Sequence, residues 1–189
     1  SKPGLNFGLV AWYPFDGNAS DMSGNGNDLT NVGATSGTNK FGVSGMAYRI
    51  EKGQYLYDDN TSFTINSNQS FSFGIWLKLH SLDTDYPNFM ALGSHGSGSG
   101  SYNNASLHAN IMCDKDYGRK FISDFSGVDK VISNTIPNLN QWYHLFMVSN
   151  TNDAKLYING QLSTTAVINS DSLPTIPTKL TFGHYLTWT

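Results

Sequence analysis

A regular alternation of apolar and polar side chains is the feature that most constrains the fold of this chain. In residues 70–79, SFSFGIWLKL, every odd-numbered residue is apolar, whereas the even-numbered residues are serine, glycine, tryptophan and lysine. A period of two places these sets on opposite faces of an extended strand. Because Trp76 adds an apolar group to the second face, the pattern indicates a sandwich strand with one covered face and one concave, partly exposed face.

Short segments of this kind recur along the chain, and helical periodicity is nearly absent. The clearest hairpin is KLYINGQLSTTAV, in which Asn159 and Gly160 supply the positive φ values of a two-residue type I′ turn. Further strands are predicted within residues 9–15, 29–35, 45–50, 54–58, 62–65, 88–95, 106–112, 120–125, 130–135, 142–150 and 179–184.

Many short strands separated by turns predict an all-β fold, an antiparallel two-sheet sandwich or jelly roll. Strands are expected on both sides of the Gly/Ser-rich residues 94–104, so we interpret that stretch as a mobile loop rather than a domain boundary. We therefore expect residues 1–189 to form a single domain.

Composition excludes several classes of protein. Only 13% of the 189 residues are charged and the formal net charge is −3, so the chain lacks the basic surface of a nucleic-acid-binding protein. No apolar run approaches the roughly 20 residues of a membrane-spanning helix, which argues against membrane insertion. The single cysteine, Cys113, excludes an intrachain disulfide, and we expect a buried thiol. Ser1–Gly8 lacks a signal-peptide pattern, so any export signal is expected outside these residues.

The scarcity of glutamate argues against sugar hydrolysis. Glycosidases use a pair of Asp or Glu carboxyl groups, but Glu51 is the single glutamate here. Asp83 and Asp85, like Asp114 and Asp116, have the i, i+2 spacing that puts two carboxylates on one strand face. Both pairs lie in turn-like contexts, where solvated loop acids are the favoured interpretation. We predict that the protein is not an enzyme.

The strongest candidate for a metal site is the loop of residues 16–29, DGNASDMSGNGNDL. Calcium takes six to eight hard oxygen ligands, and glycines let a loop turn tightly around the ion. An EF-hand is excluded, because position twelve counted from Asp21 is Val32 rather than glutamate. The alternative is that the Asn and Asp side chains cap turns of their own backbone. The candidate calcium ligands are Asp16, Asp21, Ser23, Asn25 and Asp28.

Candidate ligand-binding residues lie in loops that could form one rim of the sandwich. Sugar sites combine an aromatic platform with Asp, Asn and Gly groups from such loops, because sugars present C–H faces and dense hydroxyls. The candidate rim segments are residues 82–88, 94–104, 113–120 and 184–188. The side chains singled out are Asp83, Asp85, Tyr86, Tyr102, Asn103, Asn104, Asp116, Tyr117 and Arg119.

The remaining aromatic and histidine residues are predicted to be structural. Trp76 and Trp142 lie in or at the start of a strand and are expected in the core or on a sheet face, and Trp12 belongs to the predicted first strand. His144 lies within a strand, and the five histidines show no metal-binding spacing.

Four stretches, residues 9–35, 70–79, 140–150 and 155–162, resemble the laminin G-like branch of the concanavalin A-like lectin/glucanase superfamily. The resemblance implies two curved antiparallel sheets packed face to face, with binding loops along one rim. It also implies a structural calcium ion, for which Asp16 and Asp21 would be the carboxylate ligands, and extracellular or cell-surface recognition. The family's final Gly-x-Ile-Asp-Asp-like strand is not visible, so an open sheet edge is expected unless that strand arrives from elsewhere in a longer protein.

These observations lead to three hypotheses for function. The first is a non-catalytic extracellular recognition or adhesion module that binds a glycan or a cell-surface protein through its rim loops. The second is a structural scaffold domain of a large adhesin, which binds calcium alone and carries a neighbouring ligand-binding domain. The third, a glycoside hydrolase, is disfavoured by the single glutamate. Fold alone does not choose among them.

Overall fold

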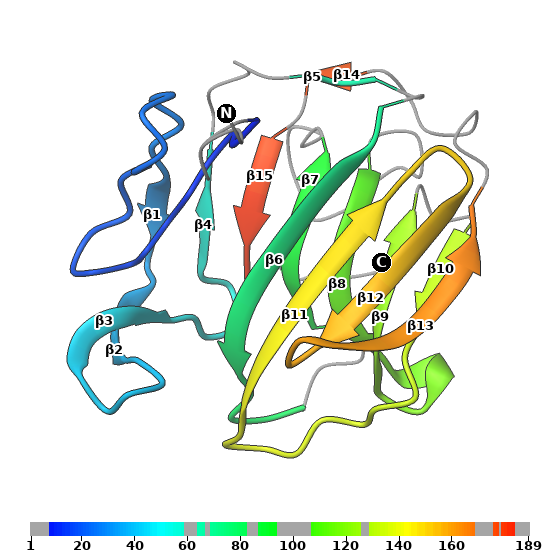
Figure 1. Ribbon diagram of the computed structural model, residues 1–189. Coiled ribbons are helices and arrows are strands. Elements are labelled where there is room, and N and C mark those ends of the chain that lie inside the picture. The colour runs from blue at the N-terminus through cyan, green and yellow to red at the C-terminus, as the bar shows by residue number, and fades with distance from the viewer. Residues whose placement is uncertain are drawn as a thin grey trace.

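Nearly all segments with a period of two form β-strands in the computed structural model (Figure 1). The structure describes residues 8–58, 64–66, 69–82, 87–93, 107–125, 129–168, 176–177 and 179–183. Within these residues the single helical element is a short 3-10 turn, η2 (Lys115–Tyr117). No helix in this part of the chain is long and apolar enough to cross a membrane. The predicted all-β, antiparallel fold is confirmed.

Two antiparallel sheets make up the sandwich. The seven-stranded sheet has the order β1 (Thr30–Val32), β4 (Tyr55–Tyr57), β15 (Lys179–Phe182), β7 (Asn88–Gly93), β8 (Leu107–Asp114), β9 (Lys120–Phe125) and β10 (Asp129–Ile132). The four-stranded sheet has the order β13 (Gln161–Val167), β12 (Asp153–Ile158), β11 (Trp142–Ser149) and β6 (Phe71–Lys78). Two short ladders lie outside these sheets: β2 (Thr35–Thr38) with β3 (Ser44–Arg49), and β5 (Thr64–Ile65) with β14 (Ile176–Pro177).

The core lies between the two sheets and follows the sequence alternation. Alternate residues of β11 and β12 are buried, beginning with Tyr143 and Ala154, and the intervening residues are half-exposed. On β6, Phe73 and Leu77 are buried, whereas Trp76 is exposed on the other face. The strand predicted over residues 70–79 therefore has the predicted facing, and Trp76 lies on a sheet face rather than in the core.

The predicted hairpin turn is also present. Asn159 and Gly160, between β12 and β13, have φ values of 52° and 81°, the positive values that a type I′ turn needs. The Asn159 side chain reaches beyond the turn, because its Oδ1 accepts a hydrogen bond of 2.8 Å from the backbone N–H of His144. This bond ties the turn to β11.

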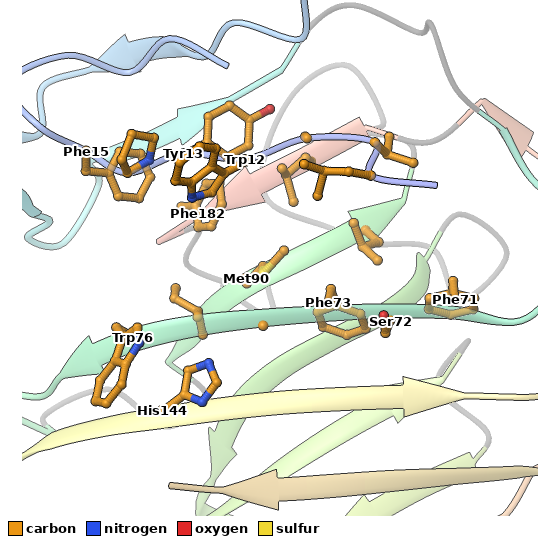
Figure 2. Close-up of a pocket in the computed structure, with 18 of the residues that line it drawn as sticks. Trp12, Tyr13, Phe15, Phe71, Ser72, Phe73, Trp76, Met90, His144 and Phe182 are labelled. Atoms are coloured by element: carbon orange, nitrogen blue, oxygen red, sulfur yellow. The ribbon is translucent and has the colours of Figure 1, made fainter. Parts of the chain in front are cut away.

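The first predicted strand is not formed. Residues 9–15, which with Gly8 make up what we call the N-terminal segment, join neither sheet. The segment runs along the open side of the sandwich, across from β6 (Figure 2). Its backbone is bound mainly by side chains of the loop at residues 16–29, which replace the ladder bonds of a strand.

Candidate functional site

A groove of about 1050 Å³ separates the N-terminal segment from β6. Figure 2 shows Met90 and Phe182 between these two walls, and Trp76 and His144 on the far side of β6. Leu92 and Leu180 also line the groove, so its floor consists of core residues of the seven-stranded sheet. We call this feature the β6 groove.

Exposed apolar side chains gather around the β6 groove. Trp12 is 55% exposed and Trp76 is 46% exposed. Phe41 and Met46, from the β2–β3 hairpin, are exposed as well, and so is Val10. All five line the same groove. Contiguous exposed apolar surface of this kind marks interaction sites on soluble proteins.

The outer face of the four-stranded sheet carries aromatic side chains on neighbouring strands. Trp76 of β6 is the direct partner of His144 of β11, and their rings stack with centroids 4.9 Å apart. Two residues further along β11, Phe146 is paired with Tyr157 of β12. We call Trp76, Trp142, His144, Phe146 and Tyr157 the aromatic patch.

Two lysines lie against the tryptophans of the aromatic patch. Lys40 Nζ lies 3.6 Å from the centre of the Trp76 ring and 4.7 Å from that of Phe41. Lys78 Nζ lies 5.3 Å from the centre of the Trp142 ring. These are cation–π distances. The patch therefore combines flat apolar rings with two ammonium groups that can donate hydrogen bonds.

His144 is held neutral by its surroundings. Burial lowers the pKa of His144 from its usual value, and the nearby Lys40 ammonium lowers the pKa further. A neutral imidazole can both donate and accept a hydrogen bond. At neutral pH the ring therefore supports Trp76 without adding a second positive charge beside Lys40.

Gly74 makes room for the ring of Phe146 within the patch. The two residues are direct partners in the β6–β11 register. A Cβ at Gly74 would overlap the Phe146 ring and would lie 3.0 Å from the Leu145 carbonyl oxygen. Glycine inside a strand often marks such a close approach.

The loop at residues 16–29 binds the backbone of the N-terminal segment. The centre of this network is the buried carboxylate of Asp21. Its Oδ1 accepts from the N–H groups of Trp12 and Ser23, at 2.9 and 2.8 Å. Its Oδ2 accepts from Ser23 Oγ and from the Asn27 N–H, at 2.7 and 3.1 Å. Burial alone would raise the pKa of Asp21, but these hydrogen bonds outweigh it and hold the pKa below its usual value.

Two asparagines of the loop complete the attachment. Asn25 Nδ2 donates to the carbonyl oxygens of Leu9 and Val10, at 2.8 and 3.0 Å. Asn27 Nδ2 also donates to the Val10 carbonyl, at 2.9 Å. The loop at residues 16–29 is therefore the structure that fixes one wall of the β6 groove.

Aromatic packing fixes the same wall from the other side. Tyr13 and Phe15 lie edge-on to Phe182, with centroids 5.7 and 5.5 Å apart, respectively. Tyr13 Oη donates to the Asn27 carbonyl at 2.6 Å. Burial, followed by the carboxylate of Asp58, raises the pKa of Tyr13 far above its usual value, so the phenol stays a donor. Trp12, which directly precedes Tyr13, remains exposed at the groove.

The five candidate calcium ligands do not, as placed, fit an ion. Asp28 Oδ1 accepts from the Asp21 N–H at 2.8 Å, and both oxygens of Asp21 are engaged as described. A carboxylate has about four acceptor sites, so Asp21 would have to exchange hydrogen bonds for the ion. Asp16 is exposed and lies outside the network. In the described residues no three His, Cys, Asp or Glu side chains come together in a way that could hold a metal ion. Calcium at this loop stays a prediction of the sequence, and the hydrogen bonds favour the alternative, in which the Asp and Asn side chains bind the protein's own backbone.

Three of the predicted rim residues lie on the turn after β8. The Asp116 N–H donates to the carboxylate of Asp114 at 2.8 Å, which caps η2. Tyr117 is exposed. Arg119 Nη1 donates to the Leu82 carbonyl at 2.6 Å, so this side chain ties the turn to another loop. None of the three lines the β6 groove. The other rim residues, Asp83, Asp85, Tyr86, Tyr102, Asn103 and Asn104, lie outside the described residues.

The single glutamate forms an ion pair, whereas Asp114 and the single cysteine are buried. Glu51 is exposed and forms an ion pair with Arg49. Asp114 is buried rather than solvated, and burial raises its pKa. Cys113 is buried as expected, and burial raises the pKa of its thiol to about 12. A thiol with so high a pKa is protonated at neutral pH and is a poor nucleophile.

Residue patterns alone did not identify the aromatic patch. The available signal was Trp76 on the polar face of the strand at residues 70–79, together with the even-numbered aromatic residues of 142–146. What the sequence does not contain is the β6–β11 register, which places Trp76 against His144.

Comparisons with known proteins agree with this architecture. A family model described as the concanavalin A-like lectin/glucanases superfamily (Laminin_G_3) matches residues 51–186. No curated protein matches the chain significantly.

Three solved structures share the fold at low sequence identity. One is domain 4 of AbnA, an extracellular arabinanase of Geobacillus stearothermophilus, in complex with arabinotriose. It has 18% identity and a TM-score of 0.60, and the match covers 94% of this chain and 93% of that domain. The second is a structure of botulinum neurotoxin type C, a toxin whose cell entry depends on interaction with two ganglioside molecules. It has 15% identity and a TM-score of 0.62, and the match covers 95% of this chain and 43% of the toxin chain. The third is the binding domain of botulinum neurotoxin DC with rat synaptotagmin II, with 12% identity, a TM-score of 0.65, and coverage of 95% and 44%. The chain thus spans less than half the length of either toxin structure.

Proposed function

Because the chain belongs to the concanavalin A-like lectin/glucanases superfamily, we propose that it is a non-catalytic recognition module that binds carbohydrate on the aromatic patch. The observation that carries this proposal is the exposed ring of Trp76, held in place by its stack on His144. A solvent-exposed tryptophan fixed by strand pairing has no role in the core and is costly to leave in water.

The chemistry of the patch suits a sugar ring. The C–H face of a pyranose or furanose packs on an aromatic ring, and the surrounding hydroxyls need donors and acceptors. Lys40 and Lys78 supply donors beside the two tryptophans, and the exposed Ser72 lies on the same face of β6. A sugar that stacks on the Trp76 face occupied by Lys40 displaces that ammonium, which is then free to bind a hydroxyl or a carboxylate of the sugar.

The ligands of the structural relatives support the same class of function. The arabinanase domain holds arabinotriose, one toxin depends on gangliosides, and another binds synaptotagmin II. For the present chain they support a glycan or a cell-surface protein as partner and an extracellular or cell-surface location.

Catalysis is not part of the proposal. The single glutamate, Glu51, is exposed and paired with Arg49 on the β3 side of the molecule, and neither residue lines the groove. Among the lining residues that the structure describes, the titratable side chains are Lys40, Tyr13 and His144, and none of these is a carboxylate. A glycosidase needs two carboxyl groups flanking the scissile bond.

A glycan array tests the proposal directly. The array should include arabinan oligosaccharides and ganglioside glycans, and any positive glycan should then be titrated by calorimetry. Saturable binding of at least one glycan supports the recognition module. Silence across the array would favour the scaffold hypothesis, in which the domain carries a neighbouring ligand-binding domain. Release of sugar from any bound oligosaccharide would overturn the non-catalytic assignment.

A further inference from the structure

Two lysines beside the aromatic patch have no ionic partner. Lys40 Nζ lies over the Trp76 ring and Lys78 Nζ lies over the Trp142 ring. Within the part of the chain that the structure describes, neither ammonium group forms an ion pair with a carboxylate. A cation–π contact orients an ammonium group but does not neutralise it, so both positive charges remain available to a ligand.

The face of the four-stranded sheet that carries the patch is basic, although the chain as a whole has a formal net charge of −3. The charged residues at the outward positions of its strands are Lys78 on β6 and Asp153 and Lys155 on β12. Asp153 and Lys155 pair with each other, with Oδ2 and Nζ 3.3 Å apart. Lys78, together with Lys40 from the β2–β3 hairpin, therefore gives this face an unbalanced positive charge, which attracts anions.

The two tryptophans of the patch are close enough to bind adjacent sugar rings. In the β6–β11 register, Trp76 is opposite His144 and Trp142 is opposite Lys78. Trp142 and His144 are two positions apart on the same face of β11, so Trp76 and Trp142 are diagonal neighbours. Such neighbours lie about 7–8 Å apart, a separation that two consecutive rings of an oligosaccharide can span. Each indole ring therefore offers a stacking surface with an ammonium group against it.

We propose that the aromatic patch selects an anionic oligosaccharide, whose adjacent sugar rings stack on the two tryptophans and whose carboxylate or sulfate group binds Lys40 or Lys78. This inference rests on the proposed carbohydrate binding and deepens it by naming the class of glycan. A sugar that stacks on the ring face covered by an ammonium group displaces that group. An anionic substituent then pairs with the displaced ammonium group, and a hydrogen bond between two ionised groups is shorter and stronger than one to a neutral hydroxyl.

The probes are pairs of glycans that differ mainly in charge. Trigalacturonate is compared with its methyl ester, which keeps the sugar rings and removes the negative charges. A sulfated galactose trisaccharide is compared with its unsulfated form, and ganglioside glycans are compared with and without sialic acid, so that carboxylate and sulfate are distinguished. We expect at least one acidic glycan to bind at least tenfold more tightly than its neutral form in calorimetry at low salt. This preference should shrink at high salt, because salt screens interactions between exposed charges.

Lysine substitutions test whether the anion binds beside the patch. Lys40→Gln and Lys78→Gln each remove a positive charge but keep a hydrogen-bond donor. At least one of them should reduce the ratio of acidic to neutral glycan affinity threefold or more, and the double variant should bring this ratio close to one. Lys155→Gln is the matched control, because Lys155 lies on the same sheet face but already pairs with Asp153. This variant should keep the ratio, and thermal melts verify that every variant is folded.

The outcomes separate this inference from carbohydrate binding itself. Equal binding of the acidic and neutral forms, or tighter binding of the neutral forms, would overturn the anionic class and leave the proposed function in place. A preference for acidic glycans that persists in the double lysine variant would assign the anion to another part of the chain and would also overturn the inference. Silence of every glycan, acidic and neutral, with the chain folded would overturn both the inference and the proposed function.

Discussion

Trp76 and His144 are direct cross-strand partners whose rings stack with centroids 4.9 Å apart and planes inclined by 26°. Because strand pairing fixes both residues, the stack does not depend on the conformation of a loop. A site that is already ordered loses little conformational freedom when a ligand binds. The pair is therefore the part of the aromatic patch where a substitution is most informative.

Replacing Trp76 by alanine is expected to weaken carbohydrate binding at least tenfold, about 1.4 kcal/mol, because the flat ring on which the sugar packs is removed. The melting temperature should fall by no more than about 4 °C, since the side chain is largely exposed and the aromatic stack is worth about 1 kcal/mol. Calorimetric titration of an array-positive glycan and a thermal melt measure the two effects.

Tyr117→Ala is the matched control. Tyr117 is also an exposed aromatic residue, but it lies on the turn after β8 that the sequence predicted as part of a binding rim. Unchanged glycan affinity in this variant, together with the loss in Trp76→Ala, would place the site on the aromatic patch. The reverse result would return the site to the rim loops.

The surroundings of His144 should hold its pKa below the usual value. Burial and then Lys40 lower its pKa, so the ring should titrate by NMR below the usual value of about 6.5. The folded-state pKa of His144 is below the unfolded one, so this shift contributes to the free energy of unfolding. The contribution is complete above the unfolded pKa and is lost as the pH falls through the folded pKa. Lys40→Gln should raise the titration midpoint of His144 only part of the way to the usual value, because burial is the larger cause of the shift. A midpoint unchanged by Lys40→Gln would contradict the proximity of the two groups.

Most strands of the two main sheets could be predicted because each of them carries its own local signal. The alternation at residues 70–79 gave β6 with the correct facing, and Asn159-Gly160 gave the turn between β12 and β13. Both signals are short-range: one is the period of the pleat and the other is the φ preference of two residues. Neither depends on which distant strand lies alongside.

The site could not be predicted as well, because it depends on long-range pairing. Residues 9–15 have the composition of a strand, but the loop that follows them binds their backbone and keeps them out of both sheets. The same loop resembles a calcium loop because Asp and Asn oxygens and amides serve either an ion or a backbone, and the sequence is identical in both cases. Trp76 acquires its partner only through the β6–β11 register.

Asp21→Asn should destabilise the fold by roughly 2–4 kcal/mol, because it removes a charged acceptor and turns an amide donor toward N–H groups. Asp16→Asn, at an exposed position outside the network, should change little. The lowered pKa of Asp21 gives stability that is present above its unfolded pKa of about 4 and is lost as the pH falls through the folded value. Urea melts at neutral and acidic pH measure both effects, and equal stability of the two variants would contradict a central role for Asp21.

Chelation distinguishes the two accounts of the loop at residues 16–29. As placed, four hydrogen bonds satisfy Asp21, so we expect the melting temperature to be the same with and without excess EDTA. A ligand that binds only the folded state raises its stability. A melting temperature that falls in EDTA and recovers with calcium, but not with magnesium, would therefore establish the calcium site that the sequence predicts.

Gly74→Ala should disturb the aromatic patch from the strand next to Phe146. The added Cβ overlaps the Phe146 ring and approaches the Leu145 carbonyl oxygen to 3.0 Å, and such overpacking costs about 1–3 kcal/mol, or a few degrees in melting temperature. Ser72→Ala, on the same exposed face of β6, is the control and should be nearly neutral. If the cost arises at the Phe146 ring, the double variant Gly74→Ala/Phe146→Ala should be less destabilised than the sum of the single variants. Simple additivity would instead assign the cost to the backbone contact with Leu145.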